Sequence, residues 1–185
     1  MKILTIPNPI LRTKSKPVTA IDKKLVDFIN DLAQTLDKKR NPEGVGLSAP
    51  QVGKNLRIFA TRLKNKQGDR ILRTYINPTP TRVSPQLTLG PNPDKPFLEG
   101  CLSIPELYAP VKRHAWIKLE YFTLDPTTQS LLKHSKRFES FPARVIQHEL
   151  DHLEGILFTD RAVADNLPIY QDKNGDLVEI TLPQF

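Results

Sequence analysis

The stretch RVIQHELDHLEG, Arg144 to Gly155, contains two of the four histidines in the chain, four positions apart. Residues four apart share one face of an α-helix, so His148 and His152 can bind one metal ion from the same side. Glu149 directly follows the first histidine and completes an H-E-x-x-H pattern. Catalytic zinc sites usually have three protein ligands and a water molecule, so this helix predicts a metal centre whose third ligand lies elsewhere.

The residues around this stretch indicate where the helix begins and ends. Pro142 suits the first helical turn, with Ser140 or Phe141 preceding it, and Gly155 suits a glycine stop at the carboxyl end. Apolar residues lie on more than one side of the expected helix, which indicates that it is buried. A buried helix would shield a metal centre from water.

Length and composition indicate one domain, residues 1–185, in a chain with 38% hydrophobic and 25% charged residues. No apolar run approaches the roughly 18 residues that a membrane helix needs, and the first residues do not resemble a signal peptide. The single cysteine, Cys101, excludes an internal disulfide and suits a reducing compartment such as the cytoplasm. We therefore expect a cytoplasmic protein without a membrane partner.

The net charge of +7 permits a polyanionic neighbour such as RNA. The lysines and arginines are nevertheless spread along the chain, and aromatic residues do not alternate with them as they do in RNA-binding sheets. A solvated basic surface explains the charge, so we expect no specific nucleic-acid partner.

Periodicity predicts a mixture of helices and strands. Ile21 to Arg40 has apolar residues at helical spacing, and Asp22 is a suitable N-cap. The proline-rich segment 78–96 is predicted to be a loop or a sheet edge. Asn174 and Gly175 predict a turn near the carboxyl end, followed by a short strand. Alternating or β-branched runs predict three further strands, at 56–63, 73–79 and 116–125.

Two known patterns of zinc peptidases do not supply a third ligand. In H-E-x-x-H-x-x-G-x-x-H the last position would be Phe158, which cannot bind a metal. The other pattern takes a glutamate from a later helix, but the candidates are Glu154 and Glu179, and the latter lies in a predicted strand. As an alternative to a metal site, the histidines could be hydrogen-bonded core residues, with Glu149 paired to Arg144.

Cys101, in FLEGCLSIP, is the remaining candidate ligand. A lone cysteine is often an inert, buried side chain. Here, however, it lies among residues typical of turns, and a Cys-His-His set leaves a fourth coordination position open. A thiolate favours iron(II), zinc or cobalt over magnesium.

Three segments resemble, in order and spacing, the motifs of the peptide deformylase family: GVGLSAPQVG (44–53), EGCLSIP (99–105) and QHELDHLEG (147–155). The segments ILTIPNPILR (3–12), INP (76–78) and GILF (155–158) are also similar to that family. The resemblance covers almost the whole chain. It implies, with the elements above, a single α+β domain in which mixed or antiparallel sheets pack around the buried H-E-x-x-H helix, with an amphipathic helix near the N-terminus.

The resemblance implies a metal site formed by Cys101, His148 and His152, with water in the fourth position. One divalent ion per chain is expected: iron(II) in the cell, with zinc, nickel and cobalt as substitutes. Glu149 would act as general base towards the bound water and would then deliver the proton to the leaving amine. The side-chain amide of Gln51 and the backbone N–H of Leu102 would stabilise the oxyanion.

The implied reaction is hydrolysis of the formyl group from the N-formylmethionine end of nascent polypeptides. Gly46 would offer backbone hydrogen bonds to an extended substrate. The methionine side chain would lie in a pocket lined by Val45, Leu102, Val145 and His148.

The chain departs from the family pattern in several places. Ser48 stands where alanine is usual, and its hydroxyl is small enough to fit and to add a hydrogen bond. The proline-rich segment 78–96 is longer than in compact members. The tail is predicted to be a strand rather than the basic helix with which some members dock on ribosomes, so only a transient ribosome association is expected. Asp151 is predicted to pair with Arg113 or Arg144, or to be a solvated charge.

Two other functions remain open at this stage. An H-E-x-x-H endopeptidase would cleave internal peptide bonds and would not need the formyl group. A basic RNA- or ribosome-binding domain with a closed structural metal would need a fourth protein ligand, but His114 and His134 have no ligand spacing.

Overall fold

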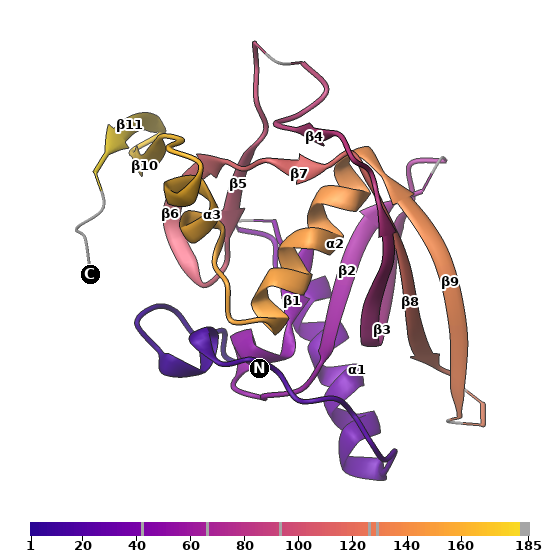
Figure 1. The fold of residues 1–185 in the computed structure, drawn as a ribbon. Coiled ribbons are helices and arrows are strands. Elements are labelled where there is room, and N and C mark those ends of the chain that lie inside the picture. The colour runs from indigo at the N-terminus through magenta and orange to yellow at the C-terminus, as the bar shows by residue number, and fades with distance from the viewer. Residues whose placement is uncertain (42, 66, 93, 126, 129, 182–185) are drawn as a thin grey trace.

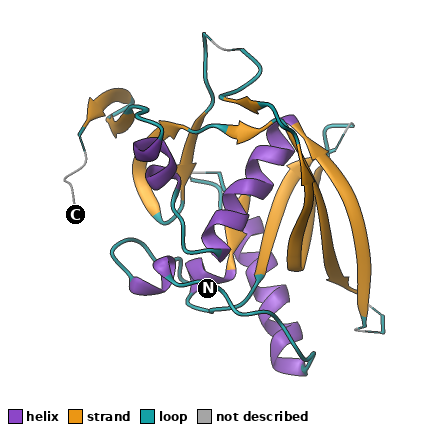
Figure 2. Ribbon diagram, in the orientation of Figure 1, coloured by secondary structure: helices purple, strands orange, loops and turns teal. Residues whose placement is uncertain are grey.

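Helix α2 (Ser140–Leu153) carries the H-E-x-x-H sequence through the middle of the molecule (Figure 1). The computed structural model describes all residues except 42, 66, 93, 126, 129 and 182–185. Strands lie on both sides of α2, as Figure 2 shows. The predicted buried helix is therefore present, and its buried residues include Arg144, Glu149 and His152 as well as apolar side chains.

The two ends of α2 differ in how well the sequence predicted them. The helix begins at Ser140, so the prediction that Ser140 or Phe141 precedes it is wrong. Strand β9 (Leu131–Glu139) runs directly into the helix, and Ser140 makes the change of direction with a φ of +55°. Gly155 has a φ of +73°, and a Cβ there would lie 2.6 Å from the backbone of Arg12. The predicted glycine stop is confirmed.

A five-stranded antiparallel sheet in the order β1-β2-β3-β8-β9 forms the larger layer. Its other strands are β1 (Gly46–Ser48), β2 (Ile58–Lys64), β3 (Arg70–Val83) and β8 (Trp116–Leu124). The three predicted strands correspond to β2, β3 and β8, whereas β9 was not predicted. On one face the apolar side chains of α2 pack against Phe59, Tyr75 and Leu119.

Helix α1 (Lys23–Lys38) covers the opposite face of this sheet. Asp22 caps the helix by accepting a hydrogen bond of 2.8 Å from the backbone N–H of Leu25, as predicted. The buried side chains of α1 are all apolar: Val26, Phe28, Ile29, Leu32 and Leu36.

The proline-rich segment is more ordered than predicted at its start. Pro78 and Pro80 lie within β3, so a loop beginning at residue 78 is wrong. Strand β2 pairs with β3 only as far as Ile76, and beyond that residue β3 pairs with β8 alone. The register with β8 shifts between Ile76 and Thr79 and again between Pro80 and Arg82. Proline is tolerated because this half of β3 is a sheet edge.

A smaller four-stranded sheet, in the order β11-β10-β6-β5, lies on the other side of α2. It contains β5 (Leu98–Cys101), β6 (Ile104–Pro110), β10 (Ile169–Lys173) and β11 (Asp176–Ile180), and α3 (Phe158–Ala164) packs against it. The predicted Asn174-Gly175 turn joins β10 to β11, with positive φ at both residues. This turn and the strand after it are confirmed.

Four short elements complete the described fold: β4 (Leu87–Thr88) pairs with β7 (Arg113–His114), and η1 (Pro9–Arg12) and η2 (Ala49–Val52) are 3-10 helices. None of the described helices is long and apolar enough to cross a membrane.

Candidate metal centre and substrate cleft

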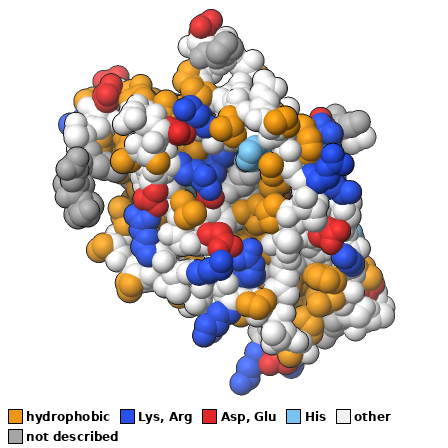
Figure 3. All heavy atoms as spheres, in the orientation of Figure 1, with side chains coloured by type: hydrophobic (Ala, Val, Ile, Leu, Met, Phe, Trp, Pro, Cys, Tyr) orange, Lys and Arg blue, Asp and Glu red, His pale blue; other side chains and the backbone are white. Residues whose placement is uncertain are grey.

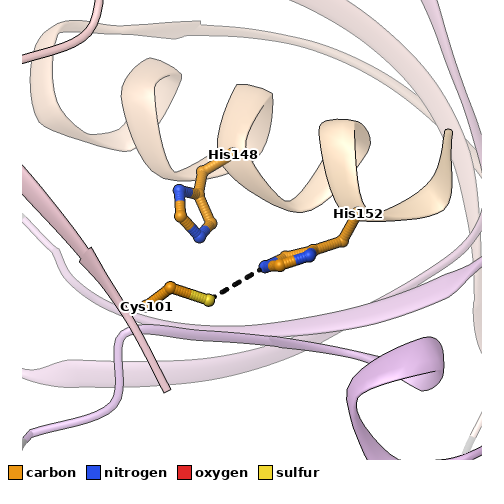
Figure 4. A group of neighbouring side chains, drawn as sticks. All are labelled: Cys101, His148 and His152. Atoms are coloured by element: carbon orange, nitrogen blue, oxygen red, sulfur yellow. Dashed lines mark hydrogen bonds between the residues drawn. The ribbon is translucent and has the colours of Figure 1, made fainter. Parts of the chain in front are cut away.

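The three predicted ligands come together where the end of β5 meets the side of α2 (Figure 4). The ligand atoms of Cys101, His148 and His152 all lie within 4.8 Å of one another. The Sγ of Cys101 is 3.2 Å from the Nε2 of His152. One soft thiol and two imidazoles are a donor set that suits iron(II) or zinc better than magnesium, so these residues fit a transition-metal ion.

Glu99 holds His148 in the orientation that this site needs. Its Oε2 lies 3.0 Å from the Nδ1 of His148, which leaves Nε2 of that ring to face the site. Glu99 is itself buried and accepts hydrogen bonds from Arg113 (2.7 and 2.9 Å) and Arg144 (2.8 Å). Burial opposes ionisation of Glu99, but Arg113 and His148 outweigh it and hold the pKa of that carboxyl well below its usual range.

Asp151 extends this buried network towards α3. Its Oδ2 lies 2.5 Å from Arg113, so the predicted pairing with Arg113 is present. The alternative pairing with Arg144 is absent, because Arg144 binds Glu99 and two backbone carbonyls instead. Arg161 of α3 makes the second ion pair with Asp151 at 2.5 Å. The sequence alone did not indicate a role for Glu99. Its position in the second motif segment, two residues before Cys101, is the sequence feature that could have indicated its place beside the site.

Glu149 lies beside the candidate metal ligands and against Gly46 of strand β1. Its side chain is 3% exposed, and its Oε2 has no hydrogen-bond partner among the described residues. Burial raises the pKa of Glu149 to about 7. A Cβ built on Gly46 would lie 2.1 Å from the Oε1 of Glu149, so only glycine leaves room for this carboxylate. A carboxylate that ionises near neutrality is suited to general acid-base chemistry.

Gln51 is buried in η2 and is held in one orientation. Its Oε1 accepts hydrogen bonds from the backbone N–H (2.8 Å) and the hydroxyl (3.0 Å) of Ser48. Its Nε2 therefore faces the site, where it donates hydrogen bonds to Ser103 Oγ at 3.1 Å and to Cys101 Sγ at 3.5 Å. The predicted extra hydrogen bond from Ser48 is present. Leu102, the other predicted oxyanion donor, follows Cys101 at the tip of the β5–β6 turn.

A cavity of about 490 Å³ opens onto these groups. The residues predicted to contact the substrate all line this cavity: Val45, Gly46, Gln51, Leu102, Val145 and His148. The sequence did not point to Phe97 and Phe141, whose rings lie 5.9 Å apart in an edge-on arrangement on the same lining.

Figure 3 shows basic side chains scattered over the visible face among acidic and hydrophobic ones, in keeping with the dispersed charge of the sequence.

Comparison with known proteins places this arrangement in a family. The family model described as "Polypeptide deformylase" matches residues 1–167. The chain belongs to the polypeptide deformylase family. Members of this family are metal-dependent hydrolases that remove the N-formyl group from nascent chains, which is the reaction that the motifs imply.

Individual relatives agree with this membership. The chain is 35% identical over 158 residues to the peptide deformylase of Brucella suis, covering 85% of this chain and 82% of that protein. It is 35% identical over 180 residues to peptide deformylase 1B, chloroplastic, of tomato (Solanum lycopersicum), but spans only 57% of that protein's length. The crystal structure of Arabidopsis thaliana peptide deformylase 1B with an inhibitor superposes with a TM-score of 0.71 at 35% identity, covering 87% of this chain and 81% of that one. The predicted family and the α+β fold are confirmed.

Proposed function

We propose that this chain hydrolyses the formyl group from the N-formylmethionine end of nascent polypeptides, with Cys101, His148 and His152 holding one divalent metal ion. The observation that carries this proposal is that Cys101, His148 and a buried carboxylate, Glu149, border one cavity, and that His152 completes a Cys-His-His cluster with the first two. When bound, the metal ion supplies the Lewis acidity that activates water and polarises a carbonyl at neutral pH.

Glu149 is the proton carrier of the reaction. Its unpartnered Oε2 takes a proton from the attacking water, whose oxygen bonds to the formyl carbon. The C–N bond then breaks, and Glu149 returns the proton to the departing nitrogen. Formate and a free amino terminus are the products.

Gln51 and Leu102 stabilise the negative charge on the formyl oxygen during this step. The Ser48 hydrogen bonds to Oε1 direct the Nε2 of Gln51 towards Cys101. The backbone N–H of Leu102 is the second donor. Donors fixed before the reaction need no reorganisation as the charge develops, and losing one typically costs about 3 kcal/mol in activation free energy.

Strand β1 binds the peptide part of the substrate. It is an edge strand of the five-stranded sheet, so the backbone of Gly46 can pair with an extended chain. Val45, Leu102, Val145 and His148 surround the methionine side chain in the cavity. Limited space beside the candidate metal ligands would exclude acyl groups larger than formyl.

Iron(II) is the metal we propose for the cell, with zinc, nickel or cobalt as substitutes, because one thiol and two imidazoles bind all four. We also propose a cytoplasmic location and, at most, a transient association with the ribosome. The tail forms the β10–β11 hairpin as far as Ile180, and the described residues there provide no basic helix.

Formate release tests this function against its rivals. Protein prepared without oxygen should release formate from formyl-Met-Ala-Ser and leave the acetylated and unmodified peptides intact. Cleavage of internal bonds irrespective of the formyl group would instead identify an endopeptidase. Metal retention without any hydrolysis would favour a binding domain with a structural metal.

Metal content tests the ligand assignment separately. Cys101→Ser should bind less metal per chain and should unfold at a lower temperature, because metal binding contributes to folding free energy. Asp27→Asn, on the exposed face of α1, is a matched control that should keep its metal. Equal metal content in Cys101→Ser and the wild type would reject the assignment.

A further inference from the structure

An arginine is buried on β2 at the end of the apolar layer that α1 covers. Side chains alternate along a strand, so Ile58, Ala60 and Arg62 share one face of β2. Ile58 and Ala60 belong to the apolar core under α1, whereas Arg62 is charged and only 3% exposed. Burying a guanidinium is costly unless its donors are paired, so the partners of Arg62 indicate what this residue does.

The guanidinium of Arg62 binds the end of α1. Its Nη1 donates a hydrogen bond of 2.9 Å to the backbone carbonyl of Asp37, and its Nη2 donates one of 3.2 Å to that of Lys39. The last carbonyls of a helix have no partner within the helix, and a cationic side chain can satisfy them. Arg62 therefore fixes the point at which the chain leaves α1.

The same residue also binds the segment Glu43–Gly46. Nη2 of Arg62 lies 3.3 Å from the carbonyl oxygen of Gly44 and 3.3 Å from Oε1 of Glu43. The backbone N–H of Arg62 donates a hydrogen bond of 2.9 Å to the carbonyl of Val45. The side chain and backbone of one residue thus hold three consecutive residues of this segment in place.

The segment Glu43–Gly46 forms one wall of the cavity at the candidate metal centre. All four of its residues line the cavity, and Gly46 lies against the carboxylate of Glu149. Arg62 is not among the described residues that line the cavity. It can therefore act on a bound substrate only through the wall that it holds.

We propose that Arg62 is a positioning residue for substrate binding, which fixes the segment Glu43–Gly46 so that the edge of β1 is ready to pair with a peptide. This inference rests on the proposed function, since it assumes that the cavity binds a formylated peptide. A strand edge that is fixed before binding loses less conformational entropy when the peptide pairs with it. Arg62 therefore lowers KM. The metal ligands and Glu149 come from β5 and α2 rather than from the segment that Arg62 holds, so kcat depends on it much less.

Two substitutions of Arg62 test this role on formyl-Met-Ala-Ser. Arg62→Met continues the apolar face of β2 but cannot donate to the carbonyls, so KM should rise by about 10- to 50-fold with kcat within about threefold of the wild type. Metal content should not change. Arg62→Lys keeps the charge but lacks the planar fork of donors, so its KM should rise by only about three- to tenfold.

A stability control separates positioning from folding. Leu32→Ala removes a fully buried side chain from the same apolar core, and it should lose stability but keep the wild-type KM per folded molecule. Amide hydrogen exchange follows the wall without relying on turnover. In Arg62→Met the amides of residues 43–46 should exchange about tenfold faster or more, while those of α2 keep their protection.

Two results would overturn the role of Arg62. A KM within twofold of the wild type, in whichever of Arg62→Met and Arg62→Lys folds, would show that Arg62 serves the fold alone. A fall in kcat at constant KM would place its effect on the chemical step and would equally reject a role in binding. Failure of the proposed function would look different, because neither the wild type nor any variant would release formate.

Discussion

Helices α1 and α2 pack on opposite faces of one sheet, yet they bury different chemistry. Helix α1 buries only apolar side chains, while α2 buries Arg144, Gln147, Glu149, Asp151 and His152 in addition to apolar ones. The side of α2 towards the large sheet is apolar, with Ala143, Ile146, Leu150 and Leu153 at helical spacing. The polar residues lie on its other side, towards β5, β7 and α3.

Because of this difference, substitutions on the two helices should change different properties of the protein. Burying a charged group is costly unless it is paired, and α2 meets that cost through a network in which Glu99, Arg113 and Asp151 satisfy one another. Helix α1 needs no such network because its buried face is hydrocarbon. Substitutions on α1 should therefore act on stability, whereas polar substitutions on α2 should act on turnover and metal binding.

The largest effect is expected for Glu149→Gln. The amide has almost the shape of the carboxylate but cannot accept the proton, so kcat should fall by about 10² to 10⁴-fold with metal content unchanged. Because burial raises the pKa of Glu149, the substitution removes an unfavourable buried charge, and the unfolding temperature should not fall. Steady-state formate release and thermal melts measure the two effects. Near-normal turnover would show that Glu149 is not the base.

Leu32→Ala, on α1, is expected to show the opposite pattern. Leu32 is 0% exposed, and truncating a buried leucine typically costs about 2–5 kcal/mol of unfolding free energy. Denaturant unfolding should show this loss, while kcat/KM per folded molecule stays within about twofold of the wild type. A large loss of kcat/KM in a fully folded variant would mean that α1 also shapes the site. The proposed division of stability and activity between the two helices would then be wrong.

The effect of Glu99→Gln should lie between those of Glu149→Gln and Leu32→Ala. The variant keeps an oxygen for the Nδ1 of His148 but loses the charge that Arg113 and Arg144 share. Metal affinity should fall by about 10- to 100-fold, as is typical when a residue that orients a ligand is altered. Competition with a chelator measures this affinity. Glu120→Gln, which removes a surface partner of Lys133, should leave it unchanged.

The two histidines of the candidate metal site could be predicted from local spacing, whereas Cys101 was joined to them through the family resemblance. His148 and His152 share a helix face whatever surrounds the helix, and the lone cysteine lay in a turn-like segment. The buried network could not be predicted in full, because it joins β5, β7, α2 and α3 through ion pairs between distant segments. The prediction for Asp151 thus named one correct partner, Arg113, and one wrong partner, Arg144.

Burial of one face made β8 predictable and its neighbour β9 not. In β8 the buried residues Ile117, Leu119 and Tyr121 alternate with more exposed ones, so the period of two is visible in the sequence. In β9 only Phe138 is buried, because the strand is the sheet edge and most of its residues face solvent. Edge position also explains why β3 continues through Pro78 and Pro80, which the sequence alone indicated as a loop or an edge.

The smallest effect is expected for Ser48→Ala, which restores the residue usual in the family. Ser48 lies in neither helix compared above, and its hydroxyl donates a hydrogen bond of 3.0 Å to Gln51 Oε1. The backbone N–H of Ser48 still holds that oxygen at 2.8 Å in the variant, so Gln51 should keep its orientation but be less firmly fixed. We expect kcat to fall by about two- to fivefold with KM unchanged, since the donor acts in the transition state. A rise in KM at constant kcat would show that Gln51 binds the ground state as strongly as the transition state, and the role of Gln51 as an oxyanion donor would then be wrong.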